Sequence, residues 1–288
     1  MTLIINALSI DIEDWFQVGA FETTIAREDW PSLAPRVERN TDAVLDMLDQ
    51  ANVKATFFAL GWVAERHPET IRKIVAAGHE LASHGYDHQR VFTMTPEAFR
   101  ADLRKSRDLL EQTGAAAITG YRAPSFSIDA RTPWAHAVLA EEGYAYSSSV
   151  APVRHDHYGW PEAPRFAFRP LTDSALIELP VTTARAFGRT FPAGGGGFFR
   201  LFPYPLSRWA VRQVNAQGHP AILYFHPWEI DPDQPRVAGA PLRSRLRHYT
   251  NLSVMGGKLE RLIGDFSWGR IDALIAREAK GAPCWPVQ

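Results

Sequence analysis

The chain has 288 residues, 45% of them apolar and 22% charged, which is the profile of a globular protein with a substantial core. Its 31 Lys and Arg residues nearly balance 32 Asp and Glu residues, so the net charge offers no long-range field for nucleic acid or an anionic membrane. The sequence has neither an apolar run long enough to span a bilayer nor a signal-peptide pattern. We therefore expect a cytoplasmic protein with no stable membrane insertion.

The predicted elements alternate between strands and helices along most of the chain. Strands are expected where short runs are apolar, β-branched or aromatic, and helices where apolar residues recur at helical spacing between capping signals. In chain order these are strand 4–12, helix 37–50, strand 54–60, helix 67–77, strand 79–83, helix 95–113, strand 117–121, helix 133–142, strands 144–150 and 176–181, helix 205–217 and strand 221–225.

This alternation predicts an α/β fold with a parallel sheet. About seven strand–helix units in a chain of this length favour a (β/α) barrel with fewer than eight strands. No internal repeat, linker or low-complexity tail is apparent, so we expect one domain over residues 1–288. Residues 190–205 and 227–256 read as long loops on one face.

Ionisable side chains follow several of the predicted strands directly. Because parallel strands of a barrel end at the same rim, we expect these side chains to converge there. They are Asp11, Glu13 and Asp14 after the first strand, His84 and His88 after strand 79–83, Arg122 after strand 117–121, and His226 after strand 221–225.

The pair His84 and His88, in the sequence HGYDH, has a spacing at which two imidazoles can reach one ion. Two histidines and one acid from the first strand would leave open positions for water and substrate, which is typical of a catalytic rather than a structural metal site. A second acid of the DIED sequence could act as general base. The alternative interpretation is two surface histidines and a solvated acidic turn.

Two further residues fit a hydrolytic site. Arg122, in YRAPSF, could orient the base carboxylate through its planar guanidinium group. His226, in LYFHPWE, could protonate a leaving amine. Aromatic residues near the expected mouth, among them Trp15 and Trp228, could stack against sugar rings, or could simply pack in the core.

Taken together, these motifs resemble the polysaccharide deacetylases of the NodB-homology group of carbohydrate esterases. That family has an Asp pair after its first strand, a His-[Ser/Thr]-x-x-His zinc pair, an Arg-x-Pro-aromatic motif and a strand ending in Leu-x-His. The corresponding sequences here are SIDIED, HGYDH, RAPSF and LYFH. The phrases DIEDWFQV, ELPVTT and FHPWEIDPDQP are more narrowly similar to a subgroup found with exopolysaccharide and exosortase (PEP-CTERM) gene clusters.

The resemblance implies a distorted (β/α)7 barrel, with a motif core over about residues 5–230 and an extension over about 231–288. It also implies a divalent ion, with zinc expected, although the same donors accept cobalt, iron or nickel. The implied roles are base for Asp11, metal ligand for His84, His88 and either Glu13 or Asp14, orientation of the base for Arg122, acid for His226, and substrate contact for Trp15, Pro124, Phe126 and Trp228.

The implied activity is removal of N-acetyl groups from an acetylated amino-sugar polymer or oligosaccharide, in exopolysaccharide biosynthesis. Two alternatives remain open at this stage. Some proteins of the same fold open cyclic imides or allantoin without a metal, and a non-catalytic carbohydrate-binding protein could retain the fold with a decayed site.

Overall fold

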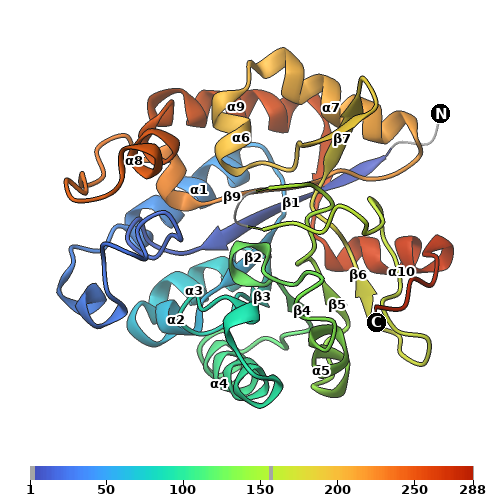
Figure 1. Cartoon of the computed structure of the whole chain (residues 1–288). Coiled ribbons are helices and arrows are strands. Elements are labelled where there is room, and N and C mark those ends of the chain that lie inside the picture. The colour runs from blue at the N-terminus through green and yellow to red at the C-terminus, as the bar shows by residue number, and fades with distance from the viewer. Residues whose placement is uncertain (1–3, 156–157, 288) are drawn as a thin grey trace.

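The computed structural model describes residues 4–155 and 158–287, and its centre is a parallel sheet wrapped by helices (Figure 1). Seven strands follow one another in the order β9-β1-β2-β3-β4-β5-β6, and all neighbouring pairs are parallel. Their bounds are β1 Ile5–Ile12, β2 Thr56–Ala59, β3 Glu80–Ser83, β4 Gly120–Tyr121, β5 Tyr146–Ser147, β6 Ile177–Glu178 and β9 Ile222–Phe225.

The first strand, β1, organises the barrel because it is long enough to pair with three others. Residues 9–12 pair with β2, residues 7–10 pair with β9, and residues 5–7 pair with β10 (Ser267–Gly269). Every β1 residue after Ile5 is buried, as expected for a strand covered on both faces. Residues after 231 thus contribute a strand to the main sheet.

The barrel is closed irregularly between β6 and β9. The Thr182 N–H donates to the Ile222 carbonyl, the Ile222 N–H donates to the Thr182 hydroxyl, and the Tyr224 N–H donates to the Gly194 carbonyl. Gly195 adopts φ +130 and passes so close to β9 that a Cβ there would lie 1.8 Å from the Tyr224 carbonyl oxygen, so only glycine fits. The expected distorted (β/α)7 barrel is confirmed.

Helices occupy most of the connections between strands (Figure 1). Their bounds are α1 Val37–Gln50, α2 Gly61–Arg66, α3 Pro68–Ala76, α4 Pro96–Gly114, α5 Ala135–Glu141, α6 Gly196–Leu201, α7 Tyr204–Ala216, α8 Leu242–Tyr249, α9 Leu252–Asp265 and α10 Asp272–Gly281. Short 3-10 turns cover Arg27–Ser32, Val91–Thr93, Pro124–Phe126 and Pro227–Ile230. No helix in the described ranges is both long and apolar enough to cross a bilayer.

The two segments expected to be long loops are largely structured, so that prediction was wrong. Residues 190–205 contain the end of strand β8 and helix α6, and residues 227–256 contain helix α8 and the start of α9. Strands β7 (Thr183–Ala186) and β8 (Arg189–Pro192) form an antiparallel hairpin outside the main sheet. The glycine run 194–197 packs against β9 and begins α6, which its composition did not indicate.

Candidate active site

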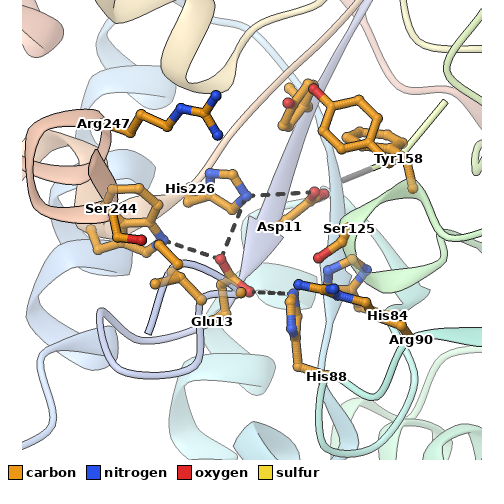
Figure 2. A pocket seen from close by; sticks show the side chains of 16 residues that line it. Asp11, Glu13, His84, His88, Arg90, Ser125, Tyr158, His226, Ser244 and Arg247 are labelled. Carbon is orange, nitrogen blue, oxygen red and sulfur yellow. Dashed lines mark hydrogen bonds and ion pairs between the residues drawn. The ribbon is translucent and has the colours of Figure 1, made fainter. Parts of the chain in front are cut away.

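A cavity of about 240 Å³ opens at the carboxyl ends of the central strands. Figure 2 shows the side chains that line it, which come from segments far apart in the sequence. The residues just after β1, β3 and β9 meet here, as the strand-end argument predicted. The lining residues of chemical interest are Asp11, Glu13, His84, His88, Ser125 and His226.

Three buried side chains form a cluster with the composition of a metal site. One potential ligand atom from each of Glu13, His84 and His88 lies within 4.8 Å of the other two. The Glu13 Oε2 atom lies 2.9 Å from His88 Nε2, yet it is buried without a hydrogen bond. A buried carboxylate oxygen without a donor, facing two imidazoles, fits a divalent cation.

The ionisation of this cluster also suits a cation. Burial would raise the pKa of Glu13, but His88, His226 and His84 outweigh it and lower that pKa to about 2. Burial lowers the pKa of His84 to about 4, so its imidazole is neutral. Its Nδ1 lies 2.8 Å from the Arg122 carbonyl oxygen and is assigned as the donor, which leaves Nε2 as the ligand atom.

Asp14, the other acid left open as a ligand, performs a different task. Its Oδ2 accepts the backbone N–H groups of Arg36 and Val37 at 2.6 and 3.0 Å, and its Oδ1 accepts the Trp15 N–H at 2.8 Å. The carboxylate therefore caps the start of α1. The structure does not place Asp14 with the imidazoles.

Asp11 is held from behind by Arg122. The Arg122 Nη1 donates to Asp11 Oδ1 at 2.7 Å and to the Ser9 hydroxyl at 2.8 Å. Its Nε and Nη2 donate to the carbonyl and hydroxyl oxygens of Ser148, and its guanidinium carbon lies 4.1 Å from the Phe58 ring centroid. Because Arg122 is fully buried and held on every side, it fixes the orientation of Asp11.

His226 lies next to Asp11 and Glu13 (Figure 2). Its Nε2 atom is 3.9 Å from Asp11 Oδ2 and 3.5 Å from Glu13 Oε1. Its Nδ1 lies 3.0 Å from Glu229 Oε2, and Glu229 Oε1 accepts from Arg200 Nε at 2.7 Å. Burial would lower the pKa of His226, but Glu13, Glu229 and Asp11 together raise it to about 9. The imidazole is therefore protonated at neutral pH.

Glu229 and Arg200 were not anticipated from the sequence. Both are buried, and Arg200 also donates to main-chain carbonyls of Arg247, His248 and Thr250. The acid three residues after His226 was a usable signal, since that spacing lets a side chain return to the preceding turn. Nothing in the sequence indicated Arg200.

The four aromatic and proline positions expected to contact substrate divide into two pairs. Phe126 and Trp228 line the cavity. Trp15 is buried, with its indole N–H donating to the Ala34 carbonyl, and Pro124 is buried close to Gly85. The structure therefore does not support a substrate contact for Trp15 or Pro124.

Two family models match this chain, and they divide it close to residue 147. "Polysaccharide deacetylase" matches residues 28–146, a range that includes His84, His88 and Arg122. "Domain of unknown function (DUF3473)" matches residues 148–276, a range that includes His226.

Curated relatives resemble part of the chain. A peptidoglycan-N-acetylglucosamine deacetylase of Bacillus cereus is 33% identical over 105 residues, which are 36% of this chain and 34% of the relative. A peptidoglycan deacetylase of Helicobacter pylori is 32% identical over 107 residues, 37% of this chain and 36% of the relative. A chitooligosaccharide deacetylase of Bradyrhizobium is 34% identical over 140 residues, 48% of this chain and 58% of the relative. The chain thus spans about a third of the first two.

Among solved structures, a putative polysaccharide deacetylase from Mycobacterium smegmatis superposes with a TM-score of 0.65 at 19% identity. The superposition covers 100% of this chain and 98% of the other. This similarity shows that the two chains share a fold.

Proposed function

We propose that this protein is a metal-dependent hydrolase that removes N-acetyl groups from an amino-sugar polysaccharide. The family model and the curated relatives support its place in the polysaccharide deacetylase family. The observation that carries the proposal is the cluster of Glu13, His84 and His88 beside a second, separately held acid, Asp11. A metal site with a free carboxylate next to it has the parts that amide hydrolysis needs.

Glu13, His84 and His88 would hold the cation, with Glu13 as the acidic ligand and zinc as the expected ion. When bound there, a divalent cation lowers the pKa of water and polarises a carbonyl oxygen. The remaining positions of such a site would stay open to water and substrate, because these three residues do not complete its coordination.

Asp11 and His226 would divide the proton transfers. As water attacks the acetyl carbonyl carbon, Asp11 accepts a proton from it, while Arg122 keeps the carboxylate oriented. His226, whose pKa is raised by the carboxylates of Glu13, Glu229 and Asp11, donates a proton to the nitrogen as the C–N bond breaks and acetate leaves. The His226 Nε2 atom lies 3.9 Å from Asp11 Oδ2 and 3.5 Å from Glu13 Oε1, and this closeness supports their action on one substrate amide.

The proposed substrate is an acetylated amino-sugar polymer or oligosaccharide. The relatives named for peptidoglycan and chitooligosaccharide deacetylation support this class, and the aromatic side chains of Phe126 and Trp228 in the cavity wall suit contact with the apolar surface of a sugar. The similarity of the HPWEIDPDQP and DIEDWFQV sequences to the exopolysaccharide-associated subgroup supports a role in exopolysaccharide biosynthesis.

The decisive experiment measures acetate release by the purified full chain from a panel of N- and O-acetylated glycans, with and without a chelator, alongside elemental analysis. We expect release from an N-acetylated glycan that the chelator abolishes and zinc restores. Chelator-insensitive hydrolysis of a cyclic imide or allantoin would favour the metal-independent alternative. Glycan binding with bound metal but no acetate release would favour a carbohydrate-binding protein.

A further inference from the structure

The helices α6 and α7 lie on the same side of the molecule as the β7–β8 hairpin (Figure 1). Residues of these elements line a second hollow, outside the candidate active site. This groove has a volume of about 280 Å³ and is lined almost entirely by apolar side chains. Four of its residues are large and exposed, namely Phe187, Phe191, Leu206 and Trp209. We call these four residues the hairpin face. Exposed apolar clusters of this kind mark sites of association.

Phe187 is the most unusual member of the hairpin face. It stands at the tip of the hairpin and is 99% exposed. Its φ is +51 and that of Gly188 is +72, a tight-turn geometry that favours Asn or Gly and disfavours a bulky aromatic residue. Neither burial nor turn conformation therefore accounts for phenylalanine at this position.

The charged residues of the segment that carries the hairpin face are all basic. Residues 179–228 contain five arginines and no lysine, aspartate or glutamate, although the whole chain has a net charge of −1. Arg185 and Arg189 flank the tip and are exposed, and Arg212 is exposed on α7. Arg208 on α7 pairs with Asp265 of α9 at 2.8 Å. Arg200 is buried and paired with Glu229. The exposed basic side chains near the hairpin face are therefore Arg185, Arg189 and Arg212.

We infer that the hairpin face docks this protein on an anionic lipid bilayer. An exposed aromatic tip between arginines suits the interface of such a bilayer, where rings sit at headgroup level and guanidinium groups meet phosphates. A second copy of the chain is a poorer occupant, because the same face on two molecules would bring like charges together. The net charge of −1 does not exclude such docking, because it averages over this local asymmetry.

The hairpin face is adjacent to the candidate active site. A small apolar pocket lies between them: Phe126 and Tyr224 line both that pocket and the catalytic cavity, while Pro192 and Phe198 line both that pocket and the groove. Docking would therefore hold the cavity beside the lipid surface. The inference concerns where the protein sits and does not depend on which reaction it catalyses.

The test is flotation of the full-length protein with vesicles of phosphatidylcholine, with or without phosphatidylglycerol. We expect binding only to vesicles that contain phosphatidylglycerol, weakening as salt is added. Phe187→Ser and the double variant Arg185→Gln/Arg189→Gln should each lower the partition coefficient by roughly tenfold. The matched control is Arg72→Gln/Lys105→Gln, which removes two exposed charges on α3 and α4 and should change nothing.

Two further measurements distinguish loss of docking from misfolding of the variants. Tryptophan quenching by brominated lipids should be seen in the wild type and largely lost in Trp209→Phe, while hydrolysis of a small soluble substrate stays unchanged in the Phe187 variant. Absence of flotation, equal flotation of the arginine variant and its control, or quenching that survives loss of Trp209 would overturn the inference. So would a dimer in solution that Phe187→Ser dissociates, because the occupant would then be a second copy.

Discussion

The indole Nε1 of Trp228 lies 3.2 Å from Oε1 of Glu13 and donates a hydrogen bond to it. The other oxygen, Oε2, is left without a donor and faces His88. The indole ring itself is clamped by stacking on His248, with centroids 4.2 Å apart, and by His226 at 5.2 Å. Trp228 thus fixes which carboxylate oxygen points toward the two imidazoles.

This relationship predicts that Trp228 affects metal affinity as well as any contact with substrate. Trp228→Phe keeps a ring in the stack but removes the N–H, so we expect metal affinity to fall by roughly 10–100-fold. Competition with a chromophoric chelator measures it. Trp268→Phe is the matched control, because that indole also donates one buried hydrogen bond, to the Leu262 carbonyl. Equal affinity in the two variants would contradict the role.

The two acids that the sequence left open can be separated by a pair of variants. Glu13→Gln removes a proposed ligand, so we expect loss of stoichiometric metal with a folded protein. Asp14→Asn weakens the contacts to the Arg36 and Val37 N–H groups at the start of α1, so we expect metal to stay bound while the free energy of unfolding falls by about 1 kcal/mol. Elemental analysis and urea unfolding measure the two outcomes, and a reversed pattern would assign the ligand to Asp14.

Asp11→Asn tests the proposed general base. The amide keeps the shape of the carboxylate next to Arg122 but cannot accept a proton, so we expect turnover to fall by about 10²–10⁴-fold with metal content unchanged. Acetate release and elemental analysis are measured on the same preparation, with thermal unfolding to detect any cost of the altered Arg122 contact. Asp129→Asn is the control, since Asp129 is also a buried acid paired with an arginine, Arg131. Near-normal turnover in Asp11→Asn would remove Asp11 from the mechanism.

Much of the candidate site follows from the positions of its residues at strand ends. His84, Arg122 and His226 were predicted correctly to converge, because parallel strands end at one rim whatever the details of packing. The two-residue alternation of side chains along a strand contained a further signal about the acids. Residues two apart on a strand share a face, so Asp11 and Glu13 point together while Asp14 turns away.

Other parts of the site depend on packing that the sequence does not report. Arg200 reaches Glu229 only because α6 packs beside the turn after β9, and the glycine run hid that helix. Trp15 and Trp228 are both tryptophans near the expected mouth of the barrel. Trp15, however, is buried against Ala34, whereas Trp228 lines the cavity. From the sequence alone, an aromatic residue can either be buried in the core or line a cavity. The packing of the neighbouring elements determines which of the two occurs.

A final prediction concerns Glu80, a buried acid at the opposite end of the barrel from the cavity. Its carboxylate accepts hydrogen bonds from the Thr56 hydroxyl, the Tyr146 hydroxyl and the Asp272 N–H. Burial, with Asp272 adding to it, raises the pKa of Glu80 from its usual value of 4.5 to about 7. The folded protein therefore prefers the protonated form more strongly than the unfolded chain does.

The sign of the effect follows from this preference. The protonated Glu80 side chain stabilises the folded protein, and this contribution is fully present below about pH 4.5. It is lost as pH rises toward 7, which lowers the free energy of unfolding by up to about 3 kcal/mol. Glu80→Gln is neutral at every pH, so the difference between variant and wild type should move in favour of the variant between pH 5 and pH 8. Urea unfolding at several pH values measures the free energy of unfolding of both proteins. The other titrating groups contribute equally to both, so their contributions cancel in the difference. A constant difference across the range would show that Glu80 has an ordinary pKa in the folded protein.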